Sequence, residues 1–370
     1  MFFTLSRQPD QRLPNHDRLA SWWFSHDNGW SLTASGWFKG YRHNTLPGGN
    51  FLELAVSGET IQLVHEAERS FPLWYNDVTE TLTNLLGSGQ PVWTATQITL
   101  EPTGIQFKKH PALGQLRSGS LTLEQGLDAI EQNLRTKFVA LAQDYANLPK
   151  KLFVSGGIDT ALILALSRQH RVVHDVVDYE HFEYDAFTNA NWEDIRARHW
   201  GYGQIHHWRS PTMLLTGACG DEFLLRGPNT LATWCAWQDI DIVDILAKST
   251  GYHVGYFNKP KNLKIFQDAY SNRHEIRDRY PTYMHLVRQI LDANINDYQY
   301  WHLGNTLTHT PFKDIELTKI MLQLPIDELI KHIIDASICK QIIGRINPEY
   351  LALVAPTKNL NSRRNLPLIF

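Results

Sequence analysis

Cysteine is scarce in this chain, with three residues among 370: Cys219, Cys235 and Cys339. Their number is odd and they lack the close pairs of a disulfide framework or a zinc ribbon, so we expect a reducing, cytoplasmic compartment. The first residues lack the basic and apolar regions of a signal peptide. No apolar run approaches the roughly 20 residues of a membrane span. We therefore expect neither secretion nor a membrane partner.

An excess of charge of one sign is also absent. Thirty-five Lys and Arg residues stand against 38 Asp and Glu residues, for a formal net charge of -3. Strong nucleic-acid binding is not expected, because such proteins gain affinity by neutralising many phosphates. The length exceeds the roughly 250–300 residues at which a single hydrophobic core stops growing, so we expect two domains.

The first part of the chain, residues 1–120, is typical of a mostly β domain. Short apolar runs there are separated by turn signals. Residues 51–56 and 61–65 predict two strands joined by a hairpin turn that contains Ser57 and Gly58.

The pattern changes at residue 122, where apolar residues begin to recur at helical spacing as far as residue 147. A long helix is predicted there, at the start of a second domain over residues 121–370. Short apolar segments at 151–154, 172–177 and 213–215 alternate with helical runs. This alternation predicts a parallel sheet with helices on its faces, followed by a mainly helical part.

The segment most informative about chemistry is Val154-Ser-Gly-Gly-Ile-Asp-Thr160, between a predicted strand and a predicted helix. Its two glycines let the backbone approach an anion, and the helix N-terminus directs free N–H groups at that anion. Asp159 would then need a metal cation between it and the phosphates, or would cap the helix. An ordinary tight turn with a capping Thr160 is the alternative.

This loop resembles the Ser-Gly-Gly-x-Asp-Ser pyrophosphate loop of the ATP pyrophosphatase superfamily, whose members cleave ATP between the α and β phosphates to adenylate a substrate. Residues 214–228 resemble the Gly-Asp-Glu signature of asparagine-synthetase-like enzymes, and residues 311–325 resemble their Pro-Phe-Leu-Asp segment and its helix. Residues 340–345 and 356–358 resemble their two closing elements. The chain is therefore identified as similar to the class II amidotransferase-type synthetases, which include β-lactam synthetases and lasso-peptide cyclases.

The resemblance extends more weakly to residues 49–75, which are similar to the family's glutaminase domain. That domain uses an amino-terminal Cys as nucleophile, whereas residue 2 here is Phe and no cysteine precedes Cys219. The expected fold class is thus α/β. A degenerate, β-rich glutaminase-like domain (1–120) that has lost its nucleophile would precede an adenylating domain (121–370) with a parallel sheet and a helical C-terminal part.

The resemblance implies ATP and Mg²⁺ as cofactors. The residues implied in nucleotide binding are Val154, Ser155, Gly156, Gly157, Asp159, Thr160, Val177, Gly217 and Arg345. Asp159 and Asp221 would hold the metal. Lys358, Asp221 and Glu222 would be the catalytic residues, with Lys358 stabilising negative charge in the transition state. Glu222 could instead serve only as a helix-start residue, and Lys358 could be a solvated surface lysine.

The residue that prepares the attacking amine departs from the family pattern. Ala218 stands where asparagine synthetases have Glu and β-lactam synthetases have Tyr, and a methyl group cannot transfer a proton. The expected function is an AMP-forming carbon–nitrogen ligase that joins small-molecule or peptide carboxylates to amines without hydrolysing glutamine. It could act as a homo-oligomer. The alternatives are an enzyme of the same superfamily that modifies a nucleotide or nucleobase, and a non-catalytic nucleotide-binding homologue.

Overall fold

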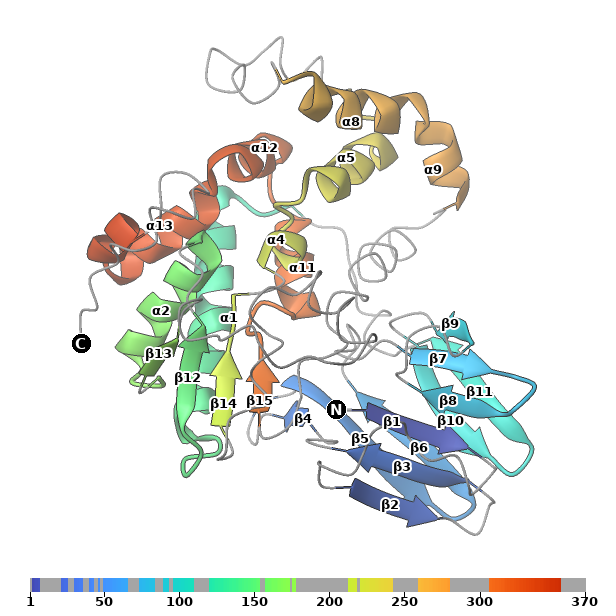
Figure 1. The fold of residues 1–370 in the computed structure, drawn as a ribbon. Coiled ribbons are helices and arrows are strands. Elements are labelled where there is room, and N and C mark those ends of the chain that lie inside the picture. Colours follow the sequence, from blue (N-terminus) through green and yellow to red (C-terminus); the bar gives the residue numbers. More distant parts are fainter. Residues whose placement is uncertain are drawn as a thin grey trace, which may run out of the picture.

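A computed structural model gives the fold of the chain (Figure 1). It describes all residues except 1, 7–20, 26–29, 36–39, 43–45, 47–48, 66–72, 84–88, 93–95, 110–119, 154–156, 174, 178–211, 218–219, 242–258, 280–305 and 354–370.

Every regular element described between residues 2 and 109 is a β-strand, in two antiparallel sheets. The six-stranded sheet has the order β2-β3-β1-β8-β7-β9 and consists of β1 (Phe2–Ser6), β2 (Ser21–Ser25), β3 (Ser31–Ser35), β7 (Leu73–Asn76), β8 (Thr81–Thr83) and β9 (Gln90–Val92). The five-stranded sheet has the order β11-β10-β6-β5-β4 and consists of β4 (Gly40–Arg42), β5 (Gly49–Ser57), β6 (Thr60–His65), β10 (Thr96–Glu101) and β11 (Gly104–Lys109).

The β5–β6 hairpin confirms the two strands predicted at 51–56 and 61–65. Gly58 lies in its turn with φ of 57°, in the left-handed region that glycine adopts without steric cost. Side chains alternate between buried and half-buried along β6 and β10. The inward side chains form one apolar core that consists of Leu5, Trp30, Leu52, Ile61, Leu63, Leu73, Leu82, Val92, Ile98 and Leu100.

Helix α1 (Leu123–Gln143) is the long helix predicted from residue 122. Thr122 and Gln125 form a reciprocal capping box, which satisfies two backbone N–H groups at the start of the helix. The helix ends four residues earlier than predicted, before a turn in which Tyr145 has φ of 51°. The ammonium of the buried Lys150 donates to the carbonyl of Tyr145 at 3.1 Å and so fixes this turn to the next strand.

A four-stranded sheet follows, in the order β13-β12-β14-β15, with every neighbouring pair parallel. Its strands are β12 (Lys150–Phe153), β13 (Asp175–Val177), β14 (Thr212–Leu215) and β15 (Thr306–His309). The first three correspond to predicted strands. The fourth was not predicted, because Thr-Leu-Thr-His contains only one large apolar side chain. The chain is thus a mixed α/β protein.

Helices lie beside this sheet and above it in the view of Figure 1. They are α2 (Ile158–Gln169), α4 (Gly220–Phe223), α5 (Pro228–Trp237), α8 (Pro260–Ser271), α9 (Arg273–Arg279), α11 (Ile315–Met321), α12 (Ile326–Asp335) and α13 (Ser337–Ile346), with a 3₁₀ turn at Pro348–Leu353. Helix α13 packs on α2, whereas α5 packs on α8 and α9. The helical run predicted between the apolar segments 172–177 and 213–215 lies outside the described residues. Within the described part, the helices are too short or too polar to cross a membrane.

Candidate functional site

The candidate site lies at the carboxyl edge of the parallel sheet. The chain leaves β12 at Phe153 and enters α2 at Ile158, and it leaves β14 at Leu215 and reaches α4 at Gly220. Because β12 and β14 are parallel neighbours, both connections emerge at the same edge, where ligands of open parallel sheets bind. This topology brings the segment of Asp159 to the segment of Asp221.

Two glycines allow these segments to touch. A β-carbon on Gly217 would lie 2.7 Å from Cγ2 and 2.8 Å from the backbone nitrogen of Thr160. A β-carbon on Gly220 would lie 2.5 Å from Cγ of Asp159. Real β-carbons do not approach other atoms so closely, so the contact between the start of α2 and the β14–α4 connection requires glycine at both positions.

The buried Thr160 is held within the first turn of α2. Its hydroxyl donates to the backbone carbonyl of Gly157 at 2.9 Å. The hydroxyl that the resemblance assigns to phosphate binding thus forms a hydrogen bond inside the loop. Gly157 begins the helix without a side-chain cap, so the N–H groups of the first turn depend on other partners.

Arg226 connects the two predicted metal carboxylates. Its Nη2 donates to Oδ2 of Asp159 at 2.8 Å and also to Oδ1 of Asp221, which accepts from Nε at 2.6 Å as well. The Arg226 and Asp159 side chains are 14% and 16% exposed, whereas Asp221 is 51% exposed. The cluster is therefore open to solvent on the side of Asp221.

Electrostatics keep this guanidinium charged. Burial opposes the charge of Arg226, but the negative charges of Asp159 and Asp221 outweigh burial and raise its pKa. The cluster of two carboxylates and one guanidinium carries a formal net charge of −1, which favours a further cation.

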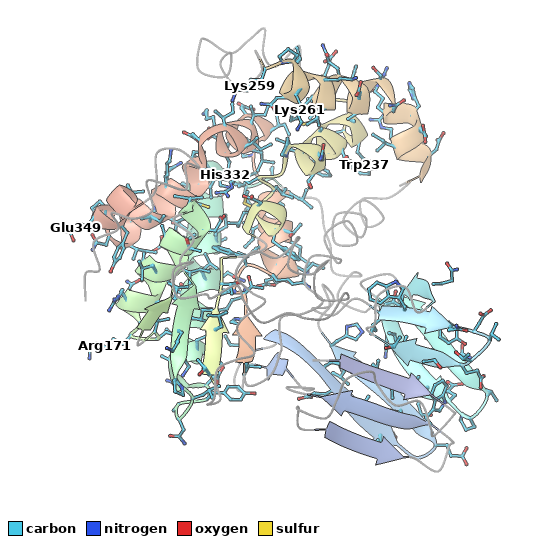
Figure 2. All side chains as sticks on the ribbon, in the orientation of Figure 1. Arg171, Trp237, Lys259, Lys261, His332 and Glu349 are labelled. Atoms are coloured by element: carbon cyan, nitrogen blue, oxygen red, sulfur yellow. The ribbon has the colours of Figure 1, made fainter. Side chains whose placement is uncertain are left out.

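Neutral groups from α12 and α13 lie behind the cluster. The fully buried His332 (Figure 2) accepts a hydrogen bond at Nδ1 from the backbone N–H of Ile338 at 3.2 Å. Burial, aided by the positive charge of Arg226, lowers the pKa of His332 to about 3. Burial, followed by the charge of Asp159, raises the pKa of the Cys339 thiol. Both groups are uncharged at neutral pH, so the Cys339 thiol is not an activated nucleophile.

The segment that resembles Pro-Phe-Leu-Asp is attached to α1. Asp314 caps α11 through a bond from the backbone N–H of Glu316 (2.8 Å), and its Oδ2 accepts from Asn133 at 3.0 Å and from the ammonium of Lys137 at 2.5 Å. Lys137 also donates to the carbonyl of Pro311 at 2.9 Å. Burial opposes the charge of Asp314, but Lys137 and these hydrogen bonds outweigh burial and lower its pKa. The segment is thereby held against α1.

The structure brings part of the predicted site together. The predicted residues that meet at the carboxyl edge are Gly157, Asp159, Thr160, Gly217 and Asp221. Glu222 lies in α4 and Val177 ends β13, but their side chains are outside the description. Val154, Ser155, Gly156, Ala218 and Lys358 lie outside the described residues, and their roles stay predictions.

Arg345 is the predicted residue that the structure does not bring to this group. It lies in the last turn of α13, and its guanidinium pairs with three carboxylates of α1: Glu124 at 2.6 Å, Asp128 at 2.8 Å and Glu131 at 3.5 Å. This network ties α13 to α1, so the geometry gives Arg345 a structural role.

The donors at the carboxyl edge include two carboxylates that could contribute to a Mg²⁺ site. The described residues contain no group of three or more His, Cys, Asp or Glu side chains that could hold a metal. The Asp159 and Asp221 carboxylates nevertheless reach one common cationic atom, Nη2 of Arg226. Two carboxylate oxygens, with phosphates and water completing the shell, are a usual ligand set for Mg²⁺. The donors therefore fit the ion.

Arg226 is the main site residue that the sequence analysis missed. The only signal was its position, five residues after Asp221, in a run of otherwise apolar residues. A scan of the sequence against models of protein families gives no match, and a search among curated proteins gives none either. Function is therefore inferred from the residues and their geometry.

Proposed function

We propose that this protein is an ATP- and Mg²⁺-dependent ligase that adenylates a carboxylate, releases pyrophosphate and transfers the acyl group to an amine. One observation supports this proposal above the others. Asp159, from the Gly-Gly loop after β12, and Asp221, from the Gly-Asp-Glu segment after β14, converge on a single cation at the carboxyl edge of a parallel sheet.

The loop and helix supply what pyrophosphate needs. Helix α2 has 12 residues, and its first turn begins at Gly157 without a side-chain cap, so backbone N–H groups and the helix dipole can face an anion. The hydrogen bond from Thr160 to Gly157 fixes this turn. Ser155 and Gly156 would extend the anion cradle, and Val154 with Val177 would form apolar walls beside the adenine.

Asp159 and Asp221 would hold Mg²⁺, which when bound neutralises charge on the phosphate oxygens. Lys358 would stabilise negative charge at the α-phosphate, and Glu222 would support Asp221. Arg345 would bind the nucleotide only if its guanidinium left its partners on α1. Because Ala218 has no group that transfers protons, a group other than residue 218, from this chain or from the substrate, would have to accept the proton of the amine. Residues 1–120 would act as scaffold, and the substrates would be small or peptide-like.

Arg226 itself favours a second candidate, a non-catalytic nucleotide-binding homologue. A guanidinium that pairs with both carboxylates stabilises them without any metal, as a chain that had ceased to bind Mg²⁺ would require. An enzyme that modifies a nucleotide or nucleobase would use the same loop and differs only in substrate.

The test is exchange of labelled pyrophosphate into ATP with a panel of carboxylates, including amino acids and short peptides. Asp159→Asn and Asp221→Asn are compared with Asp128→Asn, which removes a carboxylate from the exposed face of α1. We expect both site variants to lose at least about 100-fold of the exchange rate, because each removes a carboxylate that would hold the Mg²⁺ needed to neutralise the phosphates, and Asp128→Asn to retain it.

Three outcomes separate the candidates. Carboxylate-dependent exchange that needs both aspartates supports the ligase. Exchange that depends on a nucleoside or nucleobase in place of a carboxylate supports the nucleotide-modifying enzyme. ATP binding without exchange for any substrate supports the non-catalytic homologue, and intact exchange in Asp159→Asn refutes the metal assignment.

A further inference from the structure

Arg226 has no role in the ligase proposed above, although it pairs with both carboxylates of the site. Its guanidinium is 14% exposed, and it lies between α4 and α5, next to Leu225, whose φ is 50°. The backbone N–H groups of Arg226 and Gly227 both donate to the carbonyl of Asp221, at 2.7 Å and 3.1 Å. This short turn holds the arginine beside the carboxylate with which it pairs.

One atom of the guanidinium occupies the bridging position. Nη2 contacts Oδ2 of Asp159 at 2.8 Å and Oδ1 of Asp221. A Mg²⁺ ion bound by the same two oxygens would have to lie about 2.1 Å from each, in the space that Nη2 occupies. The guanidinium and the ion cannot be there together.

Among the described groups that interact with this cluster by charge, Arg226 is the cation that pairs with both carboxylates. The described groups coupled to it by charge are Asp159, Asp221, the thiol of Cys339 and the imidazole of His332. The last two are neutral at pH 7 because both are fully buried. Without Arg226, the carboxylates of Asp159 and Asp221 would repel each other more strongly, and a divalent cation between them would relieve that repulsion.

We infer that Arg226 is a positioning residue that holds Asp159 and Asp221 together in the metal-free protein and must withdraw before a divalent cation binds between them. The inference rests on the proposed function, because it takes the carboxylate pair as a metal site. Arg226 thereby weakens metal binding to the nucleotide-free protein. Its released guanidinium would then be available to a phosphate, which arginine binds through paired hydrogen bonds.

The experiment measures Mn²⁺ binding to the nucleotide-free full chain by electron paramagnetic resonance and calorimetry. The variants are Arg226→Met, Arg226→Lys and Arg226→Met with Asp159→Asn. Arg273→Met is the matched control, since it removes an arginine that pairs with an aspartate, Asp239, at 2.8 Å away from the site. We expect Arg226→Met to bind Mn²⁺ at least about tenfold more tightly than the unmodified protein, because competition by an intramolecular cation is removed.

The other variants should behave differently. Arg226→Lys should bind Mn²⁺ with intermediate affinity, because an ammonium lacks the planar fork that contacts both carboxylates. Adding Asp159→Asn to Arg226→Met should abolish the gain, and Arg273→Met should match the unmodified protein.

Unchanged or weaker Mn²⁺ binding by folded Arg226→Met would overturn the inference. If that variant unfolds alone but folds when Mn²⁺ is added, the inference is supported, because the metal then replaces the arginine. If it folds under neither condition, Arg226→Lys decides, and affinity no greater than that of the unmodified protein overturns the inference. The Mn²⁺ experiment does not measure adenylation, so a failure of the proposed ligase activity would be distinguishable from a failure of this inference.

Discussion

The carboxylate of Asp159 lies against the α-carbon of Gly220. A β-carbon at residue 220 would come within 2.5 Å of both Cγ and Oδ1 of Asp159. Because residue 220 is glycine, Asp159 can approach the segment that carries Asp221.

Gly220→Ala should displace Asp159 while leaving the fold intact. The atoms in conflict belong to the end of a side chain that can rotate, so we expect a loss of less than about 1 kcal/mol in the free energy of unfolding. Mn²⁺ affinity of the Arg226→Met background should fall at least about tenfold, because one ligand leaves the site. Calorimetry on the double variant checks this, and unchanged affinity would show that Asp159 does not act from this position.

Gly217→Ala tests the neighbouring contact, where the conflict involves backbone. The added β-carbon would lie 2.8 Å from the amide nitrogen of Thr160, which cannot rotate away, so we expect a loss of about 1–3 kcal/mol in chemical denaturation. Gly344→Ala in α13 is the matched control. Its β-carbon would meet only Leu351 Cδ1 at 4.0 Å, and helix propensity should stabilise it by up to about 1 kcal/mol. Equal stability of the two variants would contradict the close contact.

The sequence predicted local elements well where their patterns were strong. The apolar spacing from residue 122 onward predicted α1, and the apolar run at 61–65 after a turn predicted β6. The end of α1 was misplaced because Tyr145 lies in a left-handed turn, a conformation that a tyrosine rarely adopts and that its sequence does not signal.

Long-range pairing was harder to predict. Asp159 and Asp221 could be matched to motifs, and the parallel arrangement of β12 and β14 brings them together. The partner choices of Arg226 and Arg345 depend on three-dimensional distances that no local pattern encodes. Arg345 lies more than 200 positions from its partners on α1 in sequence, so its pairing with them could not be predicted from the sequence. The motif resemblance was the only guide to its role, and it suggested nucleotide binding.

Arg345→Met tests whether this arginine supports the fold or binds ATP. Its guanidinium pairs with Glu124, Asp128 and Glu131 while 27% exposed. We expect a stability loss of about 1 kcal/mol that shrinks as NaCl is raised, because partly exposed ion pairs are screened. The affinity for ATP, measured by calorimetry, should stay unchanged, and Arg345→Lys should lose less stability. A several-fold weaker affinity for ATP in Arg345→Met would restore the nucleotide role.

The ion pair between Lys137 and Asp314 should be strongly coupled. Lys137→Met leaves a carboxylate that is only 15% exposed without its cation, so we expect a loss of about 1–3 kcal/mol. Adding Asp314→Asn removes that charge and should recover part of the loss. A double-mutant cycle in urea measures the coupling energy, for which we expect at least about 1 kcal/mol. Additive losses would mean that the two side chains do not interact in solution.

His332 should make the protein sensitive to mild acid. Burial, with the charge of Arg226, lowers the pKa of His332 to about 3 in the folded state, whereas in the unfolded chain it is about 6.5. Between these values the unfolded chain binds a proton that the folded protein does not, so stability falls as pH decreases from about 6.5 toward 3. From pH 7 to pH 5 the protonation of this one group in the unfolded chain should lower the free energy of unfolding by about 2 kcal/mol.

His332→Asn, which retains an acceptor for the N–H of Ile338, should lose that part of the pH dependence even if it is less stable at pH 7. The exposed His274 provides the control. In urea denaturation from pH 7 to pH 5, His274→Asn should show the same pH dependence of stability as the unmodified protein. If His332→Asn also shows the pH dependence of the unmodified protein, His332 is not buried in its neutral form.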